Sequence, residues 1–337
     1  MKRYLIAFFI GLSIITVTAC KTGQTISQDI TYGIISEEIT VGKGGEWELS
    51  GILTLPRNFN GRIPAVVLVH GSGPQDMDQT IGANKPFRDI AEYLASRGIA
   101  VLRYNKRTFT HAARIVEDFR NFTIREETVD DAILATNLLR NDNRIDSERI
   151  FILGHSLGGM VAPRIDAEGG NFAGIIIMAG SPRRLADIIY DQNMAVIETL
   201  SEEDKATAQA QVNVLMGYFD SFINMTDEEA KEYTLAGASG YYWKDLDSYP
   251  SNEHLMNTEK PVLIMQGESD FQVFWDRDFL QYQTLLGGRA NVTFKLYPGL
   301  NHLFMTSTTG TIDEYGISGH VDSVVLDDIA NWIKRIN

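Results

Sequence analysis

The feature that most constrains this chain is a serine held between two glycines. The segment GHSLG at residues 154–158 follows the apolar run 150–153 and precedes small residues that suit a helix. A chain that turns sharply from a strand into a helix crowds the positions two before and two after the turn residue, so both must be glycine. The spacing therefore predicts that Ser156 lies at such a turn, with its hydroxyl exposed above a sheet edge.

Strand-like apolar segments alternate with helical patterns along the rest of the chain. This alternation is typical of the α/β class, with a mostly parallel central sheet flanked by helices. Residues 39–41 and 47–55, separated by a glycine-rich turn, predict an opening antiparallel hairpin. Continuous apolar runs predict buried strands at 65–69, 100–104, 150–153, 174–178, 261–266 and 292–297.

A long helical segment interrupts this alternation at about residues 182–255. Open α/β sheets bind ligands at the carboxyl ends of their strands, so we expect this segment to form a helical lid there. Ordinary core packing explains most of its apolar side chains. Tyr242 and Trp243 are the candidates for lining a substrate pocket, together with Phe109, which follows a strand end.

A serine hydroxyl needs a histidine to take its proton and a carboxylate to orient that histidine. Asp270 follows a predicted strand through a short loop and is the candidate acid, with Glu268 as the nearest alternative. His302 follows the next strand and is the candidate base, whereas His320 lies farther from any strand end and is expected at the surface. The order serine, acid, histidine fits this type of sheet.

Charge that develops on an attacked carbonyl oxygen needs two backbone amides. The amide of Leu157, next to the serine, is one candidate donor. The second is expected in the loop His70-Gly71-Ser72-Gly73, directly after the strand at 65–69. Ser72 is the preferred donor and Gly71 the alternative.

Four stretches together resemble the α/β-hydrolase superfamily, and within it the dienelactone-hydrolase-like and serine-aminopeptidase-like bacterial esterases. They are HGSGPQDMDQTIGANKPFRDIAEYLASRGIAVLRYNKRTF, GHSLGGM, QGESDFQV and YPGLNHLF. The resemblance covers about residues 35–337 and implies hydrolysis of carboxylic esters through an acyl-enzyme on Ser156, Asp270 and His302. Two enzymatic alternatives stay open, a small serine aminopeptidase and an acyltransferase. From another class, a catalytically silent ligand-binding lipoprotein is the third.

The N-terminus has the pattern of an export signal. Lys2 and Arg3 precede an uncharged apolar run at 4–17, which is shorter than the ~20 residues a membrane span needs. Its end, Val17-Thr18-Ala19-Cys20, resembles a bacterial lipobox, so Cys20 is the predicted lipidation site. We expect a lipoprotein signal peptide at 1–20, a polar tether at 21–34, and an exported protein anchored by lipid to a bacterial membrane, facing the periplasm or at the cell surface.

The net charge and the absence of certain motifs limit the kinds of ligand that the protein is expected to bind. A net charge of -14 argues against nucleic acid, because phosphates would be repelled. No HExxH, GxxxxGK or GxGxxG segment occurs, so no metal, nucleotide or other cofactor is expected. Asp76 and Asp78 lack the glycine and glutamate of a calcium loop and are expected to brace their own loop. The expected partner is a small-molecule ester; the sequence does not indicate an oligomeric state.

Overall fold

The computed structural model describes residues 33–249 and 251–336. The predicted signal peptide, the lipidation site Cys20 and residues 21–32 of the predicted tether lie outside the described residues. The first strand begins at Ile34, so the last residue assigned to the tether belongs to the sheet. Within the two described ranges, no helix combines the length and the apolar character that crossing a bilayer requires.

A central sheet of eight strands, in the order β1-β2-β4-β3-β5-β6-β9-β10, forms the body of the protein. β1 and β2 form the predicted antiparallel hairpin, β2 is also antiparallel to β4, and all other neighbours are parallel. The predicted mostly parallel α/β sheet is therefore confirmed. The strands are β1 (Ile34–Val41), β2 (Leu49–Pro56), β3 (Ile63–Val69), β4 (Ala100–Tyr104), β5 (Ile145–His155), β6 (Gly174–Met178), β9 (Val262–Gly267) and β10 (Val292–Tyr297).

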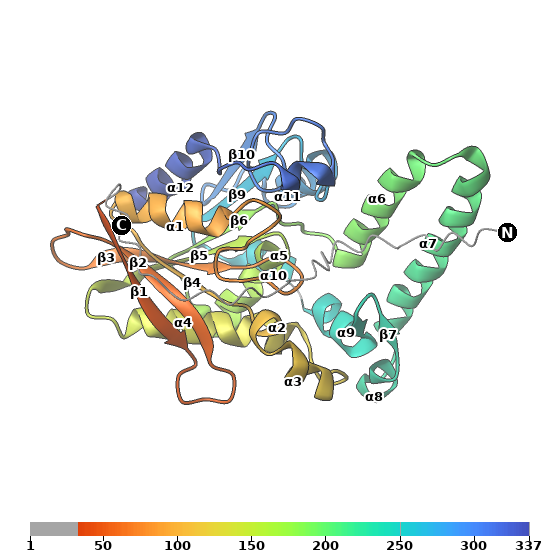
Figure 1. Cartoon of the computed structure of the whole chain (residues 1–337), viewed down its shortest axis with the longest axis horizontal. Helices are drawn as coiled ribbons and strands as arrows, with labels where there is room; N and C mark the ends of the chain where they lie inside the picture. The colour runs from red at the N-terminus through yellow and green to blue at the C-terminus, as the bar shows by residue number, and fades with distance from the viewer. Residues whose placement is uncertain (1–32, 250, 337) are drawn as a thin grey trace.

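Helices cover both faces of this sheet (Figure 1). Successive strand residues point to opposite faces, and in β3 Val67 packs into one hydrophobic cluster while Val66 and Leu68 pack into the other. The first cluster includes α4 and α5, and the second includes α1 and α12. The helices and turns of the body are α1 (Pro86–Ser96), α2 (Arg107–Thr110), α3 (Ala112–Glu117), η1 (Arg125–Val129), α4 (Asp130–Arg140), α5 (Leu157–Ile165), η2 (Asp166–Gly170), η3 (Trp275–Phe279), α11 (Leu280–Leu286), η4 (Ile312–Gly316) and α12 (Ser323–Arg335).

The interruption predicted at 182–255 lies between β6 and β9, and we call it the insertion. Its long helices α6 and α7 stand away from the sheet, while α9 lies nearer the body (Figure 1). The insertion contains α6 (Leu185–Glu198), α7 (Glu202–Phe222), α8 (Asp227–Lys231), β7 (Thr234–Leu235), β8 (Ala238–Ser239), α9 (Gly240–Ser248) and α10 (Ser251–Asn257).

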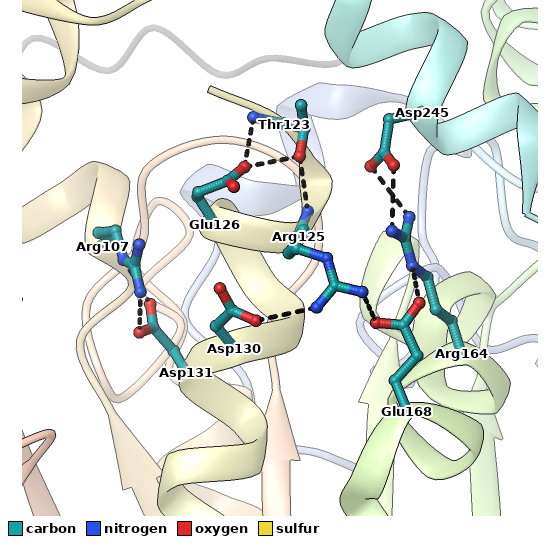
Figure 2. A network of polar contacts seen from close by, with 9 residues as sticks. All are labelled: Arg107, Thr123, Arg125, Glu126, Asp130, Asp131, Arg164, Glu168 and Asp245. Carbon is teal, nitrogen blue, oxygen red and sulfur yellow. Dashed lines mark hydrogen bonds and ion pairs between the residues drawn. The ribbon is translucent and has the colours of Figure 1, made fainter. Parts of the chain in front are cut away.

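A charged network fixes the insertion to the body (Figure 2). Arg164 on α5 donates two hydrogen bonds of 3.0 Å to Asp245 on α9 and one of 2.9 Å to Glu168. Because the Arg164 side chain is buried and planar, this bidentate contact defines where α9 sits. The helix that follows the GHSLG turn is thereby joined to the insertion.

The same network includes a capping pattern before α4, in the segment Thr123-Ile124-Arg125-Glu126. Glu126 accepts hydrogen bonds from the backbone amide and the hydroxyl of Thr123 at 2.8 and 2.6 Å (Figure 2). The Thr123 hydroxyl accepts from the amide of Arg125 instead of completing a reciprocal box, and the helix opens with the π-helical turn η1. The helix therefore begins with a turn that is wider than the first turn after a regular capping box.

Candidate active site

Ser156 lies at a strained turn between β5 and α5. Its φ of 56° and ψ of -121° are unusual for a residue with a side chain, and its amide donates to the carbonyl of Met178 at 2.8 Å. A Cβ at Gly154 would lie 2.2 Å from the carbonyl oxygen of Gly158, and one at Gly158 would lie 2.3 Å from that of Val69. The steric requirement for glycine at both flanking positions, predicted from the spacing, is what the backbone shows.

Asp270 and His302, which are 32 positions apart, meet in a buried contact. The Nδ1 atom of His302 lies 2.7 Å from Oδ2 of Asp270, and both residues are almost fully buried. The same Oδ2 accepts from Nε2 of Gln266, and Oδ1 accepts from the amides of Gln272 and Val273. A carboxylate can only accept hydrogen bonds, so Nδ1 of His302 must carry the proton that it donates to Asp270. This leaves Nε2 of His302 as the basic nitrogen.

The alternatives weighed for the acid and the base lie elsewhere. Glu268 is exposed to solvent, and its amide donates to the carbonyl of Tyr297. The side chain of His320 is 79% exposed and pairs with Asp89, as expected for a surface residue. Neither residue reaches the contact between Asp270 and His302.

Ser156 and His302 line one small polar cavity, which we call the inner cavity, of about 30 Å³. Across the described residues, the Ser156 hydroxyl makes no side-chain hydrogen bond, so a proton relay requires this hydroxyl to turn toward Nε2 of His302 within the cavity. Hydrogen bonds of this kind are often open without substrate and tighten when it binds. The cavity is lined by Gly71, Ser72, Gln75, Gln79, Ile81, His155, Ser156, Gln272, His302 and Tyr315.

Two backbone amides next to this region have no protein acceptor in the described part of the chain. In the described ranges, no backbone or side-chain oxygen accepts from the amide of Ser72 or of Leu157. Gly71 packs directly on the serine, because a Cβ at position 71 would lie 3.1 Å from Cβ of Ser156. The loop after β3 thus brings Ser72 beside Ser156, as its position after a central strand predicts.

Two structural groups support His302. His155 accepts from Nε2 of Gln79 and donates its own Nε2–H to the carbonyl of His302, both at 2.8 Å. Burial lowers the pKa of His155 to about 3, so this ring is neutral. On the other side, Asn301 donates to the carboxylate of Glu314 at 2.9 Å. The backbone and side chains around position 302 are therefore fixed by polar contacts that the strand pattern did not reveal.

An apolar cavity of about 170 Å³ lies under the insertion. Tyr242 and Trp243, the candidates for lining a substrate pocket, both line this cavity, and a narrow third cavity next to Ser156 shares Ser72 and Trp243 with it. Phe109 does not line these cavities. It is 39% exposed on the single turn α2, where its neighbour Thr108 faces inward instead, and this corrects the expectation for Phe109. The apolar cavity is lined by Ser72, Gly73, Pro74, Thr108, Ile115, Phe119, Phe122, Glu127, Leu185, Ala236, Gly237, Ala238, Ser239, Tyr242 and Trp243.

The predicted brace at Asp76 is present. Its carboxylate accepts from the amides of Asp78 and Thr80 and from the Thr80 hydroxyl, while Asp78 pairs with Lys85 and Arg103. Among the described residues, no group of three or more acidic, histidine or cysteine side chains is arranged to hold a metal ion.

The strand order and a strained serine between β5 and α5 define the α/β-hydrolase class. Residues 66–313 match a family model described as the alpha/beta hydrolase family, and the chain belongs to this family.

Similar proteins include named esterases. The chain is 37% identical over 288 residues to esterase EstD of Thermotoga maritima, a match that covers 85% of this chain and 66% of that protein. Two solved structures share the fold. Est1E from Butyrivibrio proteoclasticus is 15% identical, with a TM-score of 0.53 over 88% of this chain and 96% of that one. An esterase of Pyrococcus furiosus is 16% identical, with a TM-score of 0.53 over 94% and 96%.

Proposed function

We propose that this protein is a serine hydrolase that cleaves carboxylic esters through an acyl-enzyme. The observation that carries the proposal is the convergence of Ser156 and His302 on one cavity, with Nδ1 of His302 held by Asp270. The similarity to esterase EstD supports the same reaction class. No cofactor is needed, because the nucleophile, the base and the oxyanion donors all come from the chain.

In the first half of the reaction, Oγ of Ser156 attacks the ester carbonyl while Nε2 of His302 accepts the hydroxyl proton. Asp270 stabilises the imidazolium that forms, and the amides of Ser72 and Leu157 donate to the oxygen that gains charge. His302 then gives its proton to the departing alcohol. The acyl group remains on Ser156.

In the second half, water replaces the alcohol. A cavity of about 30 Å³ is large enough to hold a water molecule, and the inner cavity offers this water polar partners. His302 takes a proton from the water, the resulting hydroxide attacks the acyl carbonyl, and Ser156 recovers its proton as the acid leaves. Each bond formed is matched by a bond broken, and no oxidant or metal takes part.

The apolar cavity indicates the size of one side of the ester. Its volume of about 170 Å³ is close to that of an engineered apolar cavity of ~150 Å³ that binds benzene. We therefore expect a preference for an acyl group of about phenyl size over acetate or long chains. The insertion acts as the lid of this cavity, because Leu185, Tyr242 and Trp243 all come from it.

The test combines a serine variant with an ester series. Wild type should hydrolyse p-nitrophenyl esters and react with a fluorophosphonate at Ser156, and Ser156→Ala should lose at least ~10³-fold in kcat while staying folded. Retained activity in Ser156→Ala would overturn the assignment. Matched p-nitroanilides measure the aminopeptidase alternative, and added alcohols measure acyl transfer. An unreactive Ser156 in folded protein would favour the silent ligand-binding alternative.

Export with a lipid anchor is also part of the proposal. It rests on the charged, apolar and cysteine-ending pattern of residues 1–20. In a bacterial host, wild type should sediment with membranes, whereas Cys20→Ser should be released or remain unprocessed. A Cys20→Ser protein that is processed like wild type and still sediments with membranes would contradict the anchor.

A further inference from the structure

A lysine outside the predicted catalytic group contacts the loop that carries Ser72. Nζ of Lys106 donates to the carbonyl oxygen of Gly71 at 2.7 Å, and its side chain is only 3% exposed. The backbone amide of Lys106 also donates to the carbonyl of Gln75 at 3.0 Å. Lys106, the second residue after β4, and the loop after β3 are thereby fixed to each other at two points.

Because a peptide group is planar, the contact with the Gly71 carbonyl also fixes the direction of the Ser72 amide. The carbonyl of Gly71 and the amide of Ser72 belong to one planar group, and the described peptide bonds are trans. In a trans peptide these two groups point in opposite directions. A lysine that holds the carbonyl on one side therefore holds the Ser72 amide toward the other, and Ser72 borders the cavities beside Ser156.

The lysine is itself fixed by two further side chains. Oε1 of Glu127 lies 2.7 Å from Nζ of Lys106, and Oε2 accepts from the Tyr242 hydroxyl at 2.5 Å. Burial and the neighbouring carboxylate raise the pKa of Tyr242 well above its usual value, so its hydroxyl stays a donor. Since Tyr242 lies on α9, a continuous polar chain joins the insertion to the Gly71 carbonyl.

Stability alone does not explain this arrangement. Burying an ion pair costs about as much desolvation as the pair recovers, and apolar side chains of similar size often serve as well. Glu127 also borders a cavity that is otherwise mostly apolar. What an apolar replacement would lose is the hydrogen bond to Gly71.

We propose that Lys106 is a positioning residue, which orients the Gly71–Ser72 peptide group so that the Ser72 amide donates to the reacting carbonyl oxygen. Glu127 and Tyr242 hold the lysine in place. This inference rests on the proposed esterase function. It predicts a defect in stabilising the tetrahedral state, with substrate binding largely kept.

The experiment removes both charges together, because Lys106→Met alone would leave Glu127 buried without its cation. The double variant Lys106→Met/Glu127→Gln is compared with wild type for kcat, KM and affinity for a trifluoromethyl ketone, which forms a tetrahedral adduct with serine. We expect kcat and inhibitor affinity each to fall about 10²-fold while KM changes less than about threefold. Near-UV circular dichroism and thermal melting check the fold.

The neighbouring buried pair supplies the matched control. Arg107 and Asp131 form a bidentate contact of 3.0 and 2.5 Å (Figure 2), and within the described part of the chain neither has a hydrogen bond or ion pair to residues 70–73. Arg107→Met/Asp131→Asn should lower the melting temperature and leave kcat and inhibitor affinity near wild type. Equal kinetic losses in both double variants, or an unchanged kcat in Lys106→Met/Glu127→Gln, would overturn the positioning role. Absence of Ser156-dependent hydrolysis in wild type would instead overturn the proposed function.

Discussion

Asp270→Asn is the substitution that tests most directly how the buried carboxylate acts. The carboxylate has two different sides: Oδ1 accepts from two backbone amides, and Oδ2 accepts from Gln266 and His302. An asparagine must keep its carbonyl oxygen toward the two backbone donors. Its amide nitrogen then faces His302, where it can only donate.

This arrangement reverses the tautomer of His302. Nδ1 would accept from the asparagine, so the proton would move to Nε2, and the histidine could no longer take the proton of Ser156. The expected loss in kcat is about 10⁴-fold, with KM changed little. The new amide also faces Nε2 of Gln266, donor against donor, which should cost ~1–3 kcal/mol of stability.

The assay is steady-state hydrolysis of a p-nitrophenyl ester, with urea unfolding as the stability measurement. Glu268→Gln is the control, because this carboxylate lies two residues away and is exposed. It should retain full activity. A kcat for Asp270→Asn within tenfold of wild type would refute the tautomer argument, and a large loss in Glu268→Gln would transfer the role of the acid to that residue.

Three further predictions concern groups around the site. Although burial opposes it, hydrogen bonds from Asn301 and from the amides of Thr309 and Gly310 hold the pKa of Glu314 at about 2. Its ionised form therefore stabilises the fold above pH 4.5, and this contribution is lost as the pH falls toward 2. In urea unfolding, Glu314→Gln should be less stable than wild type at pH 7, and the difference in unfolding free energy between the two proteins should shrink as the pH is lowered. His155→Phe keeps a ring but removes the donor to the His302 carbonyl and the acceptor for the Gln79 amide, so kcat should fall about tenfold and the melting temperature should also fall, and an unchanged kcat would contradict this support. Trp243→Ala enlarges the apolar cavity and should shift kcat/KM toward longer acyl esters while costing ~3–5 kcal/mol of stability, whereas an unshifted ester profile would place the acyl group elsewhere.

The elements that carry Ser156, Asp270 and His302 could be predicted because local patterns determine them. Continuous apolar runs defined the parallel strands, and β4 and β6 begin and end where those runs do. In a parallel sheet the carboxyl ends of strands share one edge, so residues just beyond β5, β9 and β10 must gather there. The convergence of these three residues follows from strand order alone.

Phe109 shows where this reasoning stops. A position just after β4 was enough to predict nearness to the pocket, but the direction of a side chain on the single turn α2 depends on φ and ψ that no periodicity encodes. A shift of one to three residues decides between the exposed Phe109, the inward Thr108 and the buried Lys106. The end of a strand predicts which segment lies near the cavity, but the geometry of the following turn determines which side chain of that segment reaches it.

The chain from Lys106 through Glu127 to Tyr242 had no sequence signal for a different reason. Each member lies on a separate element, and each is individually ordinary: a lysine after a strand, a glutamate in a first helical turn and a tyrosine in an aromatic run. The three side chains come into contact only because α9 packs against η1, and the bidentate contact between Arg164 and Asp245 helps to fix that packing. A shift of the insertion would therefore act first on Tyr242, then on the lysine, and finally on the direction of the Ser72 amide. If the proposed role of Lys106 is correct, the position of the insertion and the strength of the proposed oxyanion site are physically linked, although no described residue of the insertion donates a hydrogen bond to the Gly71 carbonyl.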